Sequence, residues 1–356
     1  KQKQELENWE QTTQNMYRCG HRNGMVIELW PGDIIKLSRL ITETFAHEQF
    51  PVEVFAKVGD WRNGDYCSGR IRTLTRAGAA WQSAVALQTT LAISTFGEDD
   101  AGELYVADHA LGDIYLIAGG PPAFEPAGVV NAASFEPGIS PGGIAALFGS
   151  GLTTVQGIMG GGDPMPRQLL NTSVTVNGIA APLFAIAFVN GHEQINFQVP
   201  YEIPAGGKAT VVVTNSGVAG APVEVDVFPV QPGIFTTDGE RAAVLHGLTL
   251  VPVTAANPAS PGEVIALYAT GLGPVDIPVE TGALAPLAPL SRTALQPLVA
   301  IGGMDAAVEF AGLAPLFAGL YQVNVRVPTG VAAGELEVVI TSGGRSSRPA
   351  KIPVGP

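Results

Sequence analysis

The sequence predicts a mainly β protein in which two β-sandwiches follow one another along the chain. Its 356 residues include 44 glycines and 28 prolines but only 14% charged residues, a composition that suits short strands joined by tight turns. A set of phrases also recurs, in the same order, in the second half of the chain. Within these phrases apolar and polar residues alternate, which is the pattern of half-buried strands.

The recurring phrases define the two copies. Three pairs show the relation: PGGIAALFGSGL (residues 141–152) with PGEVIALYATGL (261–272), VTVNGIAAPLF (174–184) with VAIGGMDAAVEF (299–310), and TVVVTNSG (210–217) with EVVITSGG (337–344). A period somewhat above a hundred residues is too long for a solenoid repeat and fits a tandem pair of whole domains. We therefore expect one sandwich over residues 128–236 and a second over residues 237–356.

The strand phrase QINFQVP (residues 194–200) returns as YQVNVRVP (321–328), and each ends at a proline, which cannot donate to a β-ladder. In the first copy, apolar residues such as Ile195 and Phe197 fall on one face of the strand. Asn177 and the glycine after it suit a type I′ hairpin. Short antiparallel strands of this kind predict sandwiches of the immunoglobulin type, although the Cys, Trp, Cys pattern of true immunoglobulin domains is missing.

The ordered phrases of residues 128–354 resemble the IPT/TIG sandwich. More specifically, they resemble the uncharacterised Solibacter-type C-terminal domain of bacterial secreted proteins. The resemblance implies an extracellular location. It implies no activity and no catalytic residues, because the family has none established.

Residues 59–120 read as a partial β-propeller blade, in which GELYV and DIYLI are strands between acidic turns. This stretch resembles the last blades of the glucose/sorbosone dehydrogenase type of propeller. The resemblance implies sugar oxidation with pyrroloquinoline quinone and calcium, but the cofactor contacts of that family lie in earlier blades. Residues 1–58 are unassigned and partly helical, and they do not supply those blades. We expect a processed product or a fragment, since the chain begins without Met or an apolar signal core.

Charge and hydropathy exclude two classes of partner. The net charge of −13 and the pI near 4.8 oppose nucleic acid, whose binding depends on Lys and Arg. No apolar run approaches the roughly 20 residues of a spanning helix, so we expect no membrane segment. Cys19 and Cys67 could form one bridge or none.

Weak metal and catalytic candidates have simpler explanations. Glu98, Asp99 and Asp100 offer oxygen ligands for calcium, but an acidic turn is the simpler interpretation because the D-x-D-x-D-G pattern is lacking. The five histidines are scattered without zinc-ligand spacing. The glycine-flanked Ser150 is not a nucleophile elbow, and residues 157–164 read as a flexible loop rather than a phosphate site.

The polar face of the recurring strand is the best binding candidate. It comprises Gln194, Asn196 and Gln198 in the first copy and Gln322, Asn324 and Arg326 in the second. Amides on a sheet can pair with a surface glycan or with another extracellular protein. The alternative is cross-strand pairing among themselves on a solvated or inter-domain face.

The sequence therefore predicts a non-catalytic extracellular or cell-surface protein without a cofactor, whose sandwiches act in binding, adhesion or spacing. The alternative is the C-terminal part of a quinone-dependent sugar dehydrogenase that carries the sandwiches as appendages.

Overall fold

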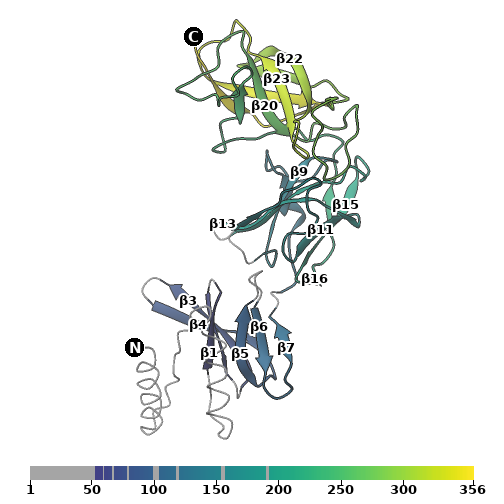
Figure 1. The fold of residues 1–356 in the computed structure, drawn as a ribbon. Coiled ribbons are helices and arrows are strands. Elements are labelled where there is room, and N and C mark those ends of the chain that lie inside the picture. The colour runs from purple at the N-terminus through teal and green to yellow at the C-terminus, as the bar shows by residue number, and fades with distance from the viewer. Residues whose placement is uncertain are drawn as a thin grey trace. The chain divides into compact units, whose positions relative to one another are not determined.

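The computed structural model describes residues 53–58, 60–65, 68–77, 80–98, 104–117, 120–153, 157–189 and 192–356. The chain divides into two compact units, Lys1–Ala118 and Gly119–Pro356. Strands dominate both units in the described residues, as predicted (Figure 1). The partly helical structure expected for residues 1–58 falls mostly outside the described residues. Of this range, the structure describes residues 53–58, which form a strand.

The N-terminal unit contains two antiparallel sheets. Strands β1 (Glu53–Val58), β2 (Asp60–Asp65), β3 (Arg70–Ala77) and β4 (Ala80–Gln88) form a meander of four. Strands β5 (Ile93–Glu98), β6 (Leu104–Asp108) and β7 (Ile114–Leu116) form a sheet of three, and β6 and β7 are the two strands expected for a blade. A small core of Ile71, Ile93, Phe96, Leu104 and Val106 joins strands of both sheets. Membership of a propeller stays a prediction.

The first sandwich follows a short 3₁₀ turn at Pro126–Gly128. One sheet has the order β10 (Gly157–Met159), β13 (Leu183–Val189), β14 (His192–Gln198), β9 (Ile144–Gly149) and β8 (Val129–Asn131). The other has the order β12 (Ile179–Ala180), β11 (Thr172–Val176), β15 (Lys208–Asn215) and β16 (Val218–Ala219), and β17 (Val223–Asp226) also pairs with β15. The apolar faces of the two sheets meet in one core, where Phe197 and Val211 are fully buried.

The second sandwich is built in the same way. Its order is β18 (Gly233–Ile234), β20 (Val264–Thr270), β23 (Tyr321–Arg326), β22 (Met304–Leu313), β21 (Leu298–Ile301), β24 (Gly334–Ser342) and β25 (Arg345–Ser346). In addition, β19 (Val244–His246) pairs with β20, and β26 (Ala350–Val354) pairs with β24. The long strand β22 takes part in both layers, because it pairs with β21 at its start and with β23 over the rest of its length.

The repeated phrases become equivalent strands. The pairs are β9 with β20, β11 with β21, β14 with β23, and β15 with β24. The register even shifts at the same place in both copies, next to Leu183 in β13 and next to Val308 in β22. The prediction of two tandem immunoglobulin-like sandwiches is therefore confirmed.

The turn chemistry read from the sequence also forms. Asn177 and Gly178 both have positive φ, of 50° and 78°, between β11 and β12. Gly302 and Gly303 have φ of 57° and 78° at the equivalent hairpin in the second copy. Two successive positive φ values are the requirement of a type I′ turn, which explains why glycine recurs here.

Candidate functional site

The amides predicted on the polar face bond to each other along the strand. Gln194 Nε2 donates to Asn196 Oδ1 at 2.6 Å in β14, and Gln322 Nε2 donates to Asn324 Oδ1 at 2.8 Å in β23. All four side chains are half-buried. The amides thus pair along one strand in each copy, whereas the alternative weighed from the sequence was pairing across strands. Whether the face also binds a ligand stays a prediction.

An aromatic ring accompanies the amides of the second copy. Gln322 lies opposite Tyr268 of β20, and Asn324 lies opposite Phe310 of β22. The guanidinium of Arg292 stands 5.0 Å from the centre of the Phe310 ring. Tyr268 is half-buried, so this face offers an aromatic edge beside a pair of amides.

The third member of the polar face behaves differently in the two copies. Gln198 is only 1% exposed, and its Oε1 accepts the backbone N–H of Gly282 at 2.7 Å. Its equivalent, Arg326, is exposed, forms an ion pair with Glu309 and donates to the carbonyl of Gly262 at 2.7 Å. Gln198 therefore lies on an inter-domain face, because the second sandwich covers this end of the first. Whether Gln198 binds a ligand stays a prediction.

Polar side chains hold the two sandwiches together at this covered end, which we call the junction. Thr270 is completely buried at the end of β20. Its hydroxyl accepts the backbone N–H of Ile144 in the first sandwich at 2.8 Å and donates to the carbonyl of Gly319 in the second at 3.1 Å. One hydroxyl therefore satisfies a backbone group on each side.

The connecting residue Gln231 is fixed from both sides as well. Its N–H donates to the carbonyl of Gly271 at 2.8 Å, and its own carbonyl accepts Asn131 Nδ2 at 2.7 Å. Its side-chain Nε2 donates to the carbonyl of Pro137 at 3.0 Å. With 1% of Gln231 exposed, the link between the sandwiches is part of the packed structure.

A loop of the second sandwich completes the junction. The hydroxyl of Thr281 accepts the N–H of Tyr201 at 3.0 Å and donates to the carboxylate of Glu202 at 2.6 Å. The carbonyl of Gly282 accepts the N–H of Met165 at 2.8 Å. Glycine is required at Gly142, where φ is +74° and a Cβ atom would lie 1.9 Å from the Tyr201 ring.

Three polar atoms of the junction have no hydrogen-bond partner among the described residues. They are the Tyr201 hydroxyl, Gln198 Nε2 and Gln231 Oε1. Burial raises the pKa of Tyr201 to about 12, and the neighbouring Gln198 side chain offsets only part of the rise. Burial also raises the pKa of Tyr321 well above its ordinary value, and Tyr201 adds to that rise.

The sequence did not identify the junction, because its bonds join residues far apart in the chain. Ile144 and Thr270, for example, are separated by 126 positions. One signal was available in the comparison of the two copies. The strand that ends in Gln198 in the first copy ends in Arg326 in the second, a difference that fits one covered end and one exposed end.

The metal candidates from the sequence stay untested. Asp99 and Asp100 lie outside the described residues, and so does the side chain of Glu98 at the end of β5. In the described part of the chain no three His, Cys, Asp or Glu residues gather closely enough to hold an ion. Asp108 serves a turn, since its Oδ1 accepts the N–H groups of Ala92 at 2.9 Å and Ala110 at 3.0 Å.

His246 is part of a packed polar cluster in the second sandwich. Its Nδ1 lies 2.5 Å from Glu263 Oε1, and its Nε2 lies 2.9 Å from Asn257 Nδ2. The other oxygen of Glu263 accepts the N–H of Ser260 at 2.9 Å. The cluster ties the loop after β19 to the start of β20, a structural task.

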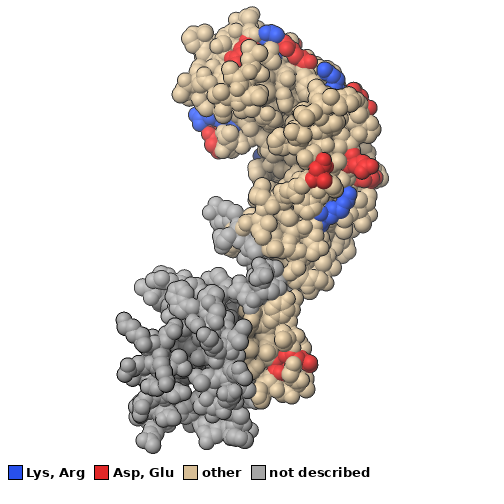
Figure 2. Space-filling view, viewed as in Figure 1, with Lys and Arg blue, Asp and Glu red and all other residues tan. Residues whose placement is uncertain are grey.

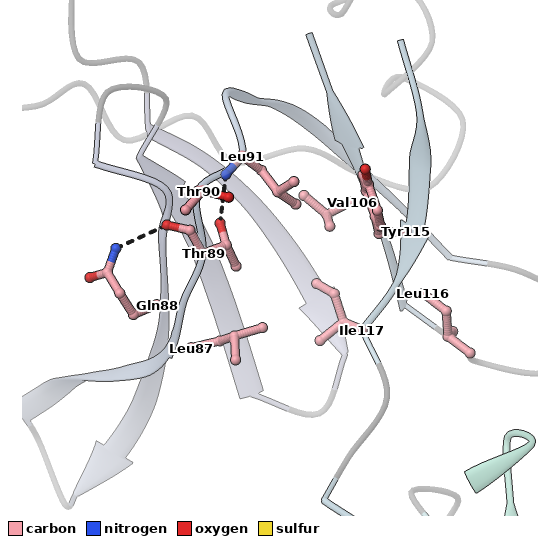
Figure 3. A pocket seen from close by; sticks show the side chains of 9 residues that line it. All are labelled: Leu87, Gln88, Thr89, Thr90, Leu91, Val106, Tyr115, Leu116 and Ile117. Carbon is pink, nitrogen blue, oxygen red and sulfur yellow. Dashed lines mark hydrogen bonds between the residues drawn. The ribbon is translucent and has the colours of Figure 1, made fainter. Parts of the chain in front are cut away.

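The N-terminal unit has a pocket of about 480 Å³ (Figure 3). One side consists of Leu87 at the end of β4 and the residues up to Leu91. The other side consists of Val106 of β6 and Tyr115, Leu116 and Ile117 at β7. Apolar groups therefore dominate the lining, and the hydroxyls of two threonines supply polar groups between them.

Charged side chains are sparse on the described surface. On the face in Figure 2 they stand singly or in small mixed groups. Several belong to ion pairs of opposite sign, such as Lys351 with Glu240 at 2.8 Å and Arg348 with Glu136 at 3.1 Å. Among the described residues, no helix has the length and apolar character needed to cross a membrane.

Comparison with known proteins gives no family. No protein-family model matches the sequence, and no curated protein matches it. Among solved structures, the chain is similar to the SGBP-B protein of the Bacteroides ovatus mixed-linkage glucan utilization locus, in complex with a heptasaccharide, with 12% identity and a TM-score of 0.25. That match covers 84% of this chain and 54% of the other, so this chain spans about half its length.

Two further similarities are of the same kind. The Yersinia pseudotuberculosis adhesin InvE matches with 13% identity and a TM-score of 0.18 over 61% of this chain and 56% of that one. Domains 5–6 of the S-layer protein SbsC match with 12% identity and a TM-score of 0.21 over 65% and 98%. At these TM-scores the function must be argued from the residues of this chain.

Proposed function

We propose that this chain is a non-catalytic extracellular or cell-surface protein whose two sandwiches form a stiff spacer that attaches or presents the N-terminal unit. The observation that carries the proposal is the hydrogen-bonded junction between the sandwiches. Tandem domains joined by a solvated linker move independently by default. Here the linker residue Gln231 is buried and bonded on both sides, which supports one preferred orientation.

The energetics of the junction favour stiffness. A rotation of one sandwich against the other would separate Thr270 from Ile144, and Gln198 from Gly282. A buried donor or acceptor that loses its partner without gaining water costs about 1 to 3 kcal/mol. Several such bonds must break together, so bending requires the whole junction to open. A spacer that sets a distance benefits from this property.

Thermal proteolysis followed by mass spectrometry tests the coupling in the full chain. We expect Thr270→Val to lower the melting temperature of peptides from both sandwiches, because the lost hydroxyl served backbone groups in both. Thr329→Val is the matched control, since Thr329 is the exposed equivalent of Tyr201 at the uncovered end of the second copy. Destabilisation confined to the second sandwich would contradict a coupled spacer.

The proposed location rests on the resemblance of residues 128–354 to domains of bacterial secreted proteins. It is tested by fractionating the source cell and probing each fraction with an antibody against the full chain. We expect the protein at the cell surface or in the medium. Recovery from the cytosol alone would contradict the extracellular part of the proposal.

A second candidate function is binding at the amide face of the second copy. The observation that favours it is the half-buried Tyr268 beside the Gln322 and Asn324 amides, because sugar rings stack on aromatic side chains and bond to amides. A titration of the full chain with soluble glycans, followed by the NMR shifts of Tyr268, tests it. Binding that survives Tyr268→Ala together with Gln322→Ala would exclude this face.

A further inference from the structure

The turn after β8 holds a phenylalanine in a backbone conformation that suits glycine. Phe135 has a φ of +55°, and 53% of it is exposed. A bulky residue at positive φ is an outlier, and strained residues of this kind cluster at binding and active sites. The packing of the core does not account for the ring, because most of it lies outside the core.

The backbone of the turn does not require an aromatic residue. Phe135 N donates to the carbonyl of Asn131 at 2.9 Å, and Leu250 N donates to the carbonyl of His246 at 2.8 Å in the equivalent turn after β19. Leu250 has nearly the same φ, of +57°. Since an aliphatic residue forms the same turn, the ring of Phe135 is a feature of the first sandwich alone.

The ring of Phe135 stands beside a second ring and a pair of amides. Its centre lies 6.3 Å from that of Phe148 in β9, and the two ring planes are inclined by 37°. Phe148 lies directly opposite Gln194 of β14, so this ring and the amide share the outer face of the sheet. Phe148, Gln194 and Asn196 are half-buried, so part of each side chain is accessible. We call these three residues and Phe135 the aromatic platform.

The amides of the aromatic platform keep bonding groups for a ligand. Their mutual bond uses Gln194 Nε2 and Asn196 Oδ1. Gln194 Oε1 then remains as an acceptor, and Asn196 Nδ2 remains as a donor. The adjoining side chains are small, since Asn196 lies between Ala146 of β9 and Ala185 of β13. A ligand therefore meets no bulky side chain at these two strand positions.

The aromatic platform carries no charge. The outward positions of β8, β9, β10, β13 and β14, as far as the structure describes these strands, contain no Asp, Glu, Lys or Arg. Glu136, which follows Phe135, forms an ion pair with Arg348 at 3.1 Å. A charged ligand would lose water on this face without gaining a counter-charge, a cost that a neutral ligand avoids.

We propose that the aromatic platform binds a neutral oligosaccharide of at least two sugar units. The apolar faces of sugar rings pack on aromatic rings, and sugar hydroxyls bond to amides. Two rings inclined by 37° cannot both lie flat against one sugar, so Phe135 and Phe148 each take one of two neighbouring units. The proposal rests on the surface location proposed above, but it does not depend on a stiff junction.

An NMR titration of the full chain tests the site, with the side-chain amide signals of Gln194 and Asn196 as reporters. The probes are cellohexaose, mannohexaose and maltohexaose, with glucose as the single sugar. We expect at least one hexasaccharide to shift both signals in a saturable way. Glucose should bind roughly tenfold more weakly or worse, because it contacts one ring only.

Two glycine variants separate the ring from the turn that carries it. Phe135→Gly removes the ring and suits the positive φ, so the turn should remain folded. We expect it to weaken hexasaccharide binding at the Gln194 signal by roughly tenfold or more. Leu250→Gly is the matched control, because it makes the same backbone change in the second sandwich, and it should leave the affinity unchanged. The melting temperature of each variant reports whether the sandwiches stay folded.

Three outcomes would overturn the proposal. The first is the absence of a saturable shift at Gln194 and Asn196 with all three hexasaccharides. The second is unchanged affinity in a folded Phe135→Gly chain, and the third is glucose binding as tight as that of the hexasaccharides. Shifts confined to Gln322 and Asn324 belong to the first outcome and would place the ligand on the second copy instead. A mobile junction would contradict the spacer but would leave these readouts unchanged.

Discussion

Glu193 and Tyr321 occupy the same position in the two sandwiches and fasten the same turn with opposite hydrogen-bonding chemistry. The Glu193 carboxylate accepts the backbone N–H groups of residues 151–153, with distances of 3.2 Å to the first and 2.9 Å to the last. The Tyr321 hydroxyl instead donates to the carbonyl of Gly273 in the equivalent turn. Both sandwiches thus have a hydrogen bond from this strand position to the turn, but the side chain that forms it differs.

Removing the carboxylate should destabilise the first sandwich. We expect Glu193→Ala to lower the free energy of unfolding by about 2 to 3 kcal/mol, because three backbone donors lose a charged acceptor. Urea titration of the full chain measures this change. Glu224→Ala, at an exposed residue of β17, should change the free energy by no more than about 0.5 kcal/mol. Equal effects of the two substitutions would show that the Glu193 bonds contribute nothing.

Removing the hydroxyl should destabilise the second sandwich less. Tyr321→Phe keeps the buried ring and leaves the carbonyl of Gly273 without its donor, so we expect a loss of about 1 to 2 kcal/mol. The same urea titration measures it. Tyr268→Phe is the matched control on the outer face of the same sandwich and should be nearly neutral. A neutral Tyr321→Phe would argue that water replaces the lost donor.

Removing the Tyr201 hydroxyl should not lower the stability at neutral pH, in contrast to removing the Tyr321 hydroxyl. Its buried hydroxyl has no hydrogen-bond partner among the described residues, so Tyr201→Phe removes an uncompensated polar group. We expect the variant to be as stable as the unchanged chain or more stable by up to about 1 kcal/mol. A clear destabilisation in the urea titration would mean that a partner, such as a buried water, satisfies the hydroxyl.

The stability of the unchanged chain and that of Tyr201→Phe should depend differently on alkaline pH. The pKa of Tyr201 is about 12 in the folded chain, against 10.0 for an ordinary tyrosine. Above pH 10 the unfolded chain releases this proton while the folded chain keeps it, so stability falls as the pH rises. The contribution is complete below pH 10 and is lost toward pH 12. Tyr201→Phe should therefore flatten the decline of stability between pH 10 and 12, and an unchanged slope would contradict the burial of this hydroxyl.

The two faces of β14 should differ sharply in their contribution to stability. Phe197 is fully buried, so we expect Phe197→Ala to cost about 3 to 5 kcal/mol through the cavity it leaves. Asn196 is half-buried and bonds only to Gln194 among its neighbouring side chains, so Asn196→Ala should cost no more than about 0.5 kcal/mol. Chemical denaturation of both variants checks the assignment, which fails if the costs are similar.

The sequence predicted the strands and their faces because alternation and turn chemistry are local. Ile195 and Phe197 are buried as expected, and Asn177 adopts the positive φ that an Asn-Gly turn requires. Alternation assigns Gln198 to the polar face correctly, but it says nothing about what covers that face. The cover comes from Gly282, 84 positions away, so local patterns cannot supply it.

Local patterns were also insufficient in the N-terminal unit. They predicted the strands GELYV and DIYLI, which form β6 and β7. Their association into a sheet of three beside a separate sheet of four depends on a core that Phe96 and Ile71 share, and these residues belong to distant segments. A pattern of short strands does not determine how many of them join one sheet.

The most direct test of a stiff spacer is the distribution of distances between one spin label on each sandwich. Labels at Glu224→Cys and Glu337→Cys, both at exposed positions, serve this purpose once Cys19 and Cys67 are replaced by serine in the full chain. We predict a single narrow distribution that broadens when Thr270→Val and Gln198→Ala are combined. A broad distribution in the chain with the intact junction would contradict the account, because the sandwiches would then move independently.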